Sequence, residues 1–161
     1  MALVNLPSGG VILDAGGGTG RVAQFFRARA GQVVVADQTY KMLQEVHQKD
    51  GLQPVCSYVE QMPFGDNTFD RIIMVDALHH VINQVSTANE LWRLLKPGGL
   101  VVIEEPNILS FEVKLIALAE KMALMRSHFI PPRQIASLFH IHNADVHIEV
   151  DGSTAWIVIT K

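Results

Sequence analysis

The stretch VILDAGGGTGRVA, residues 11–23, constrains the fold of this chain more than any other feature of its sequence. Its first residues, Val11 to Asp14, form an apolar run that is typical of a buried β-strand. Consecutive glycines follow, and beyond Gly20 the apolar residues take helical spacing. Glycine permits positive φ angles and lets a ligand come close to the backbone, so the stretch predicts a ligand-binding turn between a strand and a helix.

The rest of the chain alternates between apolar runs of strand length and stretches of helical periodicity, which is typical of a parallel sheet with helices on both faces. The Asp151-Gly152 dipeptide favours a tight hairpin, so the last strand is expected to run antiparallel to its neighbour. We therefore predict a doubly wound α/β fold in one domain, residues 1–161. The expected strands cover residues 11–14, 33–37, 54–59, 71–77 and 100–106 and the closing hairpin, and the expected helices cover residues 21–30, 40–49, 90–95, 109–125 and 131–139.

Composition excludes several classes of protein. The formal net charge of -3 and the lack of a Lys and Arg cluster argue against nucleic acid as a partner. Cys56 is the only cysteine, so an intrachain disulfide and a thiolate metal site are excluded and a cytoplasmic setting is favoured. Neither a signal peptide nor an apolar stretch of membrane-spanning length is evident, so no membrane association is expected.

The glycine-rich turn predicts a nucleotide-like ligand. In an open α/β sheet, ligands bind beyond the carboxyl ends of the strands, and the turn after the first strand forms the floor of the site. Asp37 ends the second expected strand, where its two carboxylate oxygens can accept hydrogen bonds from both ribose hydroxyls. Because NAD(P), FAD and adenosyl ligands all use such a turn, the glycines alone leave the cofactor open.

The spacing of the glycines separates these ligands. A GxGxxG pattern that starts at Gly16 would need glycine at position 21, where the chain has Arg21. Residues 18–23 satisfy a loose GxGxxA pattern, but it starts late for a tight turn after the strand. The alternation Asp14, Gly16, Gly18, Gly20 resembles instead the first motif of the class I S-adenosylmethionine-dependent methyltransferases.

Later segments carry the same resemblance over nearly the whole chain from Val11. VEQMPFGDNTFDRIIMVDALHHV, residues 59–81, is similar to the corresponding run of the small-molecule branch of that family, which includes the ubiquinone and menaquinone methyltransferases. LLKPGGLVVIEEP, residues 94–106, resembles the family's turn into its fifth strand. The resemblance implies a Rossmann-like fold, S-adenosylmethionine as cofactor, and in-line transfer of its methyl group to a small-molecule acceptor.

The resemblance also implies roles for individual residues. Asp14 would support the glycine loop and contact the methionine amino group indirectly, and Asp37 would bind the ribose. The family often has an acidic residue before Val59, where this chain has Tyr58, so the backbone of Val59 is left to contact the adenine. The implied cofactor-binding residues are Asp14, Gly16, Gly17, Gly18, Gly20, Asp37, Gln38, Val59, Glu60, Asp76 and Ala77.

His79 and His80 are the candidate catalytic residues, because they follow a strand end at the expected position of the methyl group and titrate near neutral pH. Either could accept a proton from the acceptor, and the alternative is a structural role at the start of the next helix. His140, His142 and His147 are expected to be solvated surface residues, and no metal site is predicted. The long helix over residues 109–125 is expected to pack on the core.

Only Met1 to Gly10 precede the first expected strand, whereas the family usually carries helices there that cover the cofactor. We therefore expect the N-terminal cap helices to be missing, and a bulky acceptor, a homodimer or a partner chain to close the site. A non-catalytic S-adenosylmethionine-binding regulatory module is the main alternative function. An NAD(P)-binding oxidoreductase is a weaker one, since no convincing Tyr-x-x-x-Lys pair is present.

Overall fold

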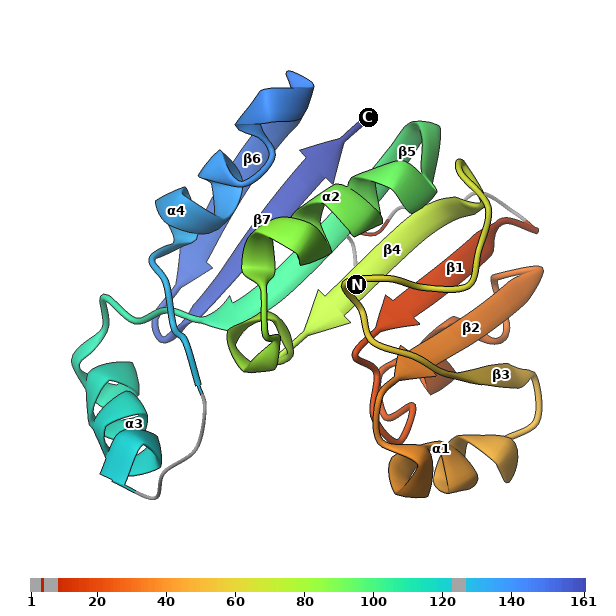
Figure 1. Cartoon of the computed structure of the whole chain (residues 1–161), viewed down its shortest axis with the longest axis horizontal. Helices are drawn as coiled ribbons and strands as arrows, with labels where there is room; N and C mark the ends of the chain where they lie inside the picture. The colour runs from red at the N-terminus through yellow and green to blue at the C-terminus, as the bar shows by residue number, and fades with distance from the viewer. Residues whose placement is uncertain (1–3, 5–8, 123–126) are drawn as a thin grey trace.

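The computed structural model describes residues 4, 9–122 and 127–161. Within them, seven strands form one sheet in the order β3-β2-β1-β4-β5-β7-β6 (Figure 1). The strands are β1 (Val11–Ala15), β2 (Gln32–Asp37), β3 (Leu52–Cys56), β4 (Phe69–Val75), β5 (Leu95–Pro106), β6 (Asp145–Asp151) and β7 (Thr154–Thr160). The helices are α1 (Tyr40–His47), α2 (Gln84–Leu94), α3 (Phe111–Met122) and α4 (Pro132–Ser137), with short 3₁₀ helices η2 (Ala23–Phe26), η3 (Leu78–His80) and η4 (His140–His142).

The topology confirms the predicted fold class. β1 to β5 run parallel to one another, while β7 pairs antiparallel with both β5 and β6. The turn of the closing hairpin falls at residues 151–154, as the Asp-Gly dipeptide predicts. The strand order reverses between β1 and β4, which is where an open α/β sheet forms its ligand-binding crevice.

The two faces of the sheet carry separate apolar clusters. Leu13 of β1 belongs to the cluster that includes Leu91 of α2 and Ile135 of α4, whereas its neighbour Ile12 belongs to the cluster with Leu43 of α1. This alternation follows from the pleat, since successive side chains of a strand point to opposite faces. Burial of each such aliphatic side chain contributes about 1.5–3 kcal/mol, so the sheet is fixed from both sides.

The prediction of a helix over residues 21–30 is wrong, because only the short 3₁₀ helix η2 forms there. The hydrogen bonds from Phe25 N to Val22 O and from Arg29 N to Phe26 O span three residues rather than four. The segment must return to β2 within a few residues, and the bond from Gly31 N to Gly10 O fixes its end. Short 3₁₀ pieces are frequent as connectors of this kind.

Several element bounds also differ from expectation. The third strand begins at Leu52 and ends at Cys56, because its register pairs Leu52 with Val33 and leaves residues 57–59 to turn toward the site. α2 begins at Gln84, earlier than expected, because the Asn83 side chain accepts a hydrogen bond from Ser86 N and caps the helix. β4 ends at Val75 rather than at residue 77, and β5 begins at Leu95, so the Lys-Pro-Gly-Gly segment lies within that strand.

The expectation of a core-packed helix over residues 109–125 is wrong for most of α3. Val113 is buried, but four apolar side chains that share one stripe are more than half exposed. Figure 1 shows α3 beside the sheet rather than across it, unlike α2 and α4. The exposed stripe consists of Phe111, Leu115, Leu118 and Met122.

Two expectations fall partly on residues that the structure does not describe. The first is the expected helix over residues 109–125, whose last residues, 123–125, lie outside the described ranges. The second is the expectation that cap helices are missing before β1, since most of that segment also lies outside the described ranges. In the described part of the chain, no helix has both the length and the apolar character needed to cross a membrane.

Candidate functional site

A cavity of about 310 Å³ lies at the carboxyl ends of β1, β2 and β4, beside the glycine-rich turn. It is where the reversal of strand order predicts a ligand site. Of the residues that the sequence indicates, it brings together Gly16, Gly18, Asp37, Gln38, Val59, Glu60, Asp76, Ala77 and His80. Asp14, Gly17, Gly20 and His79 lie outside the lining, directly behind it or in the adjoining loops.

The glycine loop depends on conformations and contacts that other residues tolerate poorly. Gly16 has a φ of 72° and its amide donates to the carbonyl of Ala36 on β2 at 2.8 Å. A Cβ on Gly16 would lie 2.7 Å from the Cβ of Ala77, so the loop after β1 is in direct contact with the loop after β4. The backbone of the loop is therefore exposed to the cavity at a position fixed from both sides.

Asp14 lies beneath this loop and carries an unpaired oxygen. Its side chain is almost completely buried, and its Oδ2 has no hydrogen-bond partner among the residues that the structure describes. Burial raises the pKa of the carboxyl to about 7, although a backbone hydrogen bond from Ala23 opposes the shift. A Cβ on Gly17 would lie 2.5 Å from the Asp14 Cγ, so only glycine fits above the carboxyl. A buried carboxyl with one free oxygen is suited to interact with a cationic ligand group.

Asp37 connects the end of β2 to the glycine loop. Its Oδ2 accepts from Gly18 N at 3.0 Å, and its Oδ1 accepts from Thr39 N at 2.7 Å. An ionised carboxylate has about four acceptor sites, so two hydrogen bonds leave capacity for a ligand. Because Asp37 lines the cavity, that capacity faces the space where a sugar hydroxyl could lie.

Val59 and Glu60 form a second wall. Val59 is buried against the core, while Glu60 Oε1 accepts from Ile82 N at 2.9 Å and Asn83 N at 3.2 Å. One oxygen of Glu60 therefore fixes the chain before α2. Tyr58 lines the same wall and is 58% exposed, which leaves its ring accessible to a planar ligand.

Asp76 marks the end of β4 with a backbone φ of 51°, which non-glycine residues rarely adopt. Burial, with the neighbouring charges of Glu105 and Glu104, raises the pKa of its carboxyl. The next residues are held by Glu105, whose Oε1 accepts from Ala77 N at 2.9 Å and from Leu78 N at 2.7 Å. The backbone around the end of β4 is thus oriented by a carboxylate from β5.

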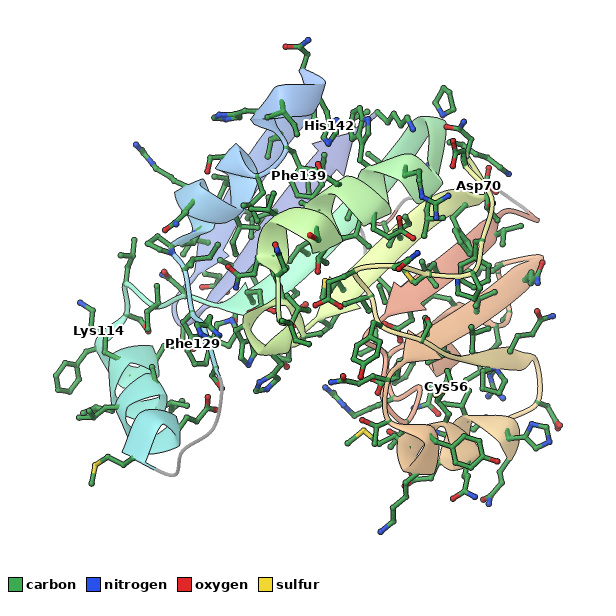
Figure 2. All side chains as sticks on the ribbon, viewed as in Figure 1. Cys56, Asp70, Lys114, Phe129, Phe139 and His142 are labelled. Atoms are coloured by element: carbon green, nitrogen blue, oxygen red, sulfur yellow. The ribbon has the colours of Figure 1, made fainter. Side chains whose placement is uncertain are left out.

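The two adjacent histidines have different surroundings. His79 is 5% exposed, and its Nδ1 lies 2.5 Å from Oε2 of Glu105. Its ring stacks on Phe129, which Figure 2 labels in the segment that follows α3. His80 lines the cavity, and its pKa is lowered by burial and then by the neighbouring His79.

The remaining histidines lie away from the cavity. His142 stacks on Trp92 with ring centroids 4.9 Å apart, and its Nε2 lies 2.9 Å from Asn89 Oδ1. His147 is exposed on β6, as expected. In the described ranges, no group of three or more His, Cys, Asp or Glu residues could hold a metal ion.

Several residues that line the cavity, and one carboxylate beside it, are not indicated by the sequence. The carboxylate is Glu105, which binds the backbone after β4 and the His79 ring. The only sign of this role in the sequence is a carboxyl group at a strand position that is expected to be buried. Most of the missed lining residues are apolar and were indistinguishable from core residues in the sequence. The missed lining residues are Thr39, Met42, Tyr58, Met74, Val81 and Ile82.

Comparisons with known proteins agree with this geometry. Residues 13–103 match a protein family described as a methyltransferase domain. The ubiquinone/menaquinone biosynthesis C-methyltransferase of Coxiella burnetii is 36% identical over 110 residues, which cover 62% of this chain and 44% of that protein. The enzyme of the same name from Methylococcus capsulatus is 34% identical over 113 residues, covering 64% and 46%. The match thus spans less than half the length of these relatives.

Solved structures share the fold. An S-adenosylmethionine-dependent methyltransferase from Mesorhizobium loti aligns with a TM-score of 0.82 at 16% identity, covering 99% of this chain and 96% of that one. Another from Archaeoglobus fulgidus aligns with a TM-score of 0.81 at 15% identity, covering 94% and 86%. At such low identities the likeness establishes the fold.

Proposed function

The chain belongs to the methyltransferase domain family, and on that premise we propose that it binds S-adenosylmethionine and transfers its methyl group to a small-molecule acceptor. The observation that carries the proposal is the buried Asp14 carboxyl, whose Oδ2 has no hydrogen-bond partner among the described residues, beneath a glycine loop whose backbone borders the cavity. A cofactor with an ammonium group and a ribose matches this carboxyl behind the loop and the spare acceptor capacity of Asp37 in the cavity wall.

The described residues fit the cofactor in three regions. The loop of Gly16, Gly17, Gly18 and Gly20, with Asp14 behind it, would hold the methionyl end together with Asp76 and Ala77. Asp37 and Gln38 would bind the ribose. Val59 and Glu60 would flank the adenine, and Tyr58 offers an exposed ring beside them in place of an acidic side chain.

When bound, S-adenosylmethionine supplies a methyl group that is transferred by in-line displacement, with the sulfonium sulfur as the leaving group. The residues of this chain therefore need to align the acceptor, exclude water and receive a proton. The candidates for this proton acceptor are His79 and His80. The lowered pKa of His80, which lines the cavity, favours the neutral imidazole that can accept a proton.

We also propose that residues 1–161 act as a single domain, and the seven-stranded sheet formed by the described residues supports this. The free, exposed Cys56 suits a reducing, cytoplasmic compartment. The exposed apolar stripe of α3 supports a homodimer or another partner chain at this side of the molecule.

The proposal is tested by calorimetric titration of the purified chain with S-adenosylmethionine, S-adenosylhomocysteine and NAD. We expect the adenosyl ligands to bind at micromolar concentration and NAD not to bind. An Asp37→Asn variant should weaken the adenosyl ligands at least about tenfold, since it removes a charged acceptor, whereas Asp145→Asn on the distant strand β6 serves as the control. Binding of NAD alone, or of none of the three ligands, would refute the proposal.

Methyl transfer is then measured with isotopically labelled S-adenosylmethionine and a panel of acceptors that begins with quinols, because the curated relatives are named for ubiquinone and menaquinone biosynthesis. We expect turnover of at least one acceptor. Cofactor binding without turnover of any acceptor would support the non-catalytic binding module instead.

A further inference from the structure

We infer that Glu105 and His79 are positioning residues, which together fix the loop after β4 so that His80 alone meets the methyl acceptor. The inference rests on the proposed function and goes beyond it, because it gives the two histidines different roles. It is carried by the contacts of Glu105, by the enclosure of the His79 ring and by the place of His80 in the cavity wall.

Glu105 is the centre of this arrangement. It is 3% exposed, and its Oε1 accepts from two consecutive backbone amides, those of Ala77 and Leu78. Its Oε2 lies 2.5 Å from Nδ1 of His79. A buried carboxylate is tolerated only when such donors satisfy it, so the three contacts hold the start of η3 in one conformation.

His79 is enclosed on its remaining sides. Its ring lies 4.3 Å from that of Phe129 with an angle of 15° between the planes, and its carbonyl accepts from His128 N at 2.7 Å. It is outside the cavity lining. An acceptor in the cavity would therefore meet His80 before His79.

His80 has the surroundings that a proton acceptor needs. It lines the cavity, its ring centroid is 4.0 Å from that of His79, and its Nδ1 lies 3.4 Å from Ser127 Oγ. The carboxylates that face it are Glu120 from α3, Glu105 from β5 and Asp76 at the end of β4, and these would stabilise an imidazolium. In the step, a bond forms between the acceptor atom and the methyl carbon while the bond from that carbon to the sulfonium sulfur breaks, and its electron pair stays on the sulfur of the leaving S-adenosylhomocysteine. The proton of the acceptor atom passes to His80, and the imidazolium later returns it to solvent.

The first test measures the tautomer of His79 in the wild-type chain by long-range ¹H–¹⁵N NMR between pH 6 and pH 8. Because an ionised carboxylate only accepts hydrogen bonds, Nδ1 of His79 should carry a proton throughout. His79→Gln and His80→Gln spectra assign the signals. An unprotonated Nδ1 on His79 would overturn the inference without the need for a Glu105 variant.

The second test compares Glu105→Gln with Glu104→Gln. The two glutamates are neighbours on β5, but Glu104 faces the opposite side of the sheet, where Oε2 accepts from Trp156 Nε1 at 2.7 Å. Glu105→Gln replaces one acceptor oxygen by a donor. We expect Glu105→Gln to move the Nδ1 proton off His79, to lower the pKa of His80 further and to reduce the affinity for S-adenosylhomocysteine about tenfold. Glu104→Gln should have none of these effects.

The outcomes separate this inference from the proposed function. If wild-type protein fails to bind S-adenosylhomocysteine, the proposed function fails, while the NMR measurements still decide the roles of the histidines. If wild-type protein binds it and Glu105→Gln behaves like Glu104→Gln, the positioning role is wrong. Should Glu105→Gln not fold, His79→Gln replaces it, with the same shift of the His80 titration and loss of affinity expected.

Discussion

The Cα of Gly16 packs against the methyl group of Ala77, so closely that a Cβ on Gly16 would lie 2.7 Å from the Ala77 Cβ. This contact joins the loop after β1 to the loop after β4, and the cofactor cavity is bordered by both.

Gly16→Ala is expected to reduce both stability and cofactor binding. Gly98→Ala is the matched control, because Gly98 has a similar φ of 76° but no atom of the described part of the chain lies within 4 Å of the added Cβ. Both variants should lose about 1–2 kcal/mol of unfolding free energy from backbone strain. Only Gly16→Ala should also reduce the affinity for S-adenosylhomocysteine, by about tenfold or more, as measured by calorimetric titration. Equal affinities for the two variants would show that the contact with Ala77 is unimportant.

Asp14 makes the stability of the ligand-free protein depend on pH. The folded-state pKa is raised from 3.8 to about 7 by burial, so the protonated form is favoured in the folded protein. The stabilisation from that proton is complete below the unfolded pKa and is lost as the pH rises through the folded pKa. It amounts to about 4 kcal/mol at most, and urea unfolding between pH 4 and pH 8 measures it.

Asp14→Asn should abolish this part of the pH dependence, since the amide stays neutral. Asp145→Asn, at an exposed position on β6, tests whether the change is specific to the buried site. A cationic ligand group held on the cavity side of the glycine loop should favour ionisation of Asp14, so S-adenosylhomocysteine binding near pH 7 should release protons. Buffers of different ionisation enthalpy would detect this release, and an identical binding enthalpy in all buffers would contradict it.

Glu90→Gln is expected to loosen the wall of the cavity that contains Val59. Glu90 is buried, its Oε1 accepts from Met62 N at 2.7 Å, and Arg93 donates to both of its oxygens. Burial alone would raise the pKa of Glu90, but these hydrogen bonds lower it overall. Loss of the charge should cost about 1–3 kcal/mol of unfolding free energy. In wild-type protein this contribution is present above the unfolded pKa and is lost as the pH falls through the folded pKa.

The exposed stripe of α3 predicts self-association. Phe111, Leu115, Leu118 and Met122 have the spacing of a helix seam that packs against another helix. Light scattering after size exclusion should give twice the monomer mass for wild-type protein and the monomer mass for a Leu115→Lys/Leu118→Lys variant. Ile141→Lys, which places lysine at another exposed apolar position, should remain dimeric. Monomeric wild-type protein at high concentration would refute the homodimer.

Much of the fold could be predicted from the sequence because the strands are buried on both faces and therefore appear as short apolar runs. The glycine loop and Asp37 could be placed because each follows a strand end directly. The short helix η2 could not be predicted, because its residues have the apolar spacing of a longer helix. Only the hydrogen bond from Gly31 N to Gly10 O shows that the chain must return to the sheet soon after η2.

The rest of the candidate site depends on contacts between distant segments. Glu105 and His79 are 26 residues apart, and nothing in the local pattern indicates that their side chains meet. The sequence therefore indicated two equivalent histidines where the structure distinguishes them by burial. Likewise, α3 is apolar around much of its circumference, so periodicity predicted a helix but not which side would pack.

The place of β7 within the sheet has a consequence for how the chain folds. This strand is the last of the seven in the sequence, yet it lies between β5 and β6 and pairs with both. Until it is present, β5 lacks one of its neighbours and β6 has none. Because such long-range pairings form slowly, we expect newly synthesised chains to leave the edges of β5 and β6 that β7 later joins unpaired, and open to association with other chains, until β7 has been made.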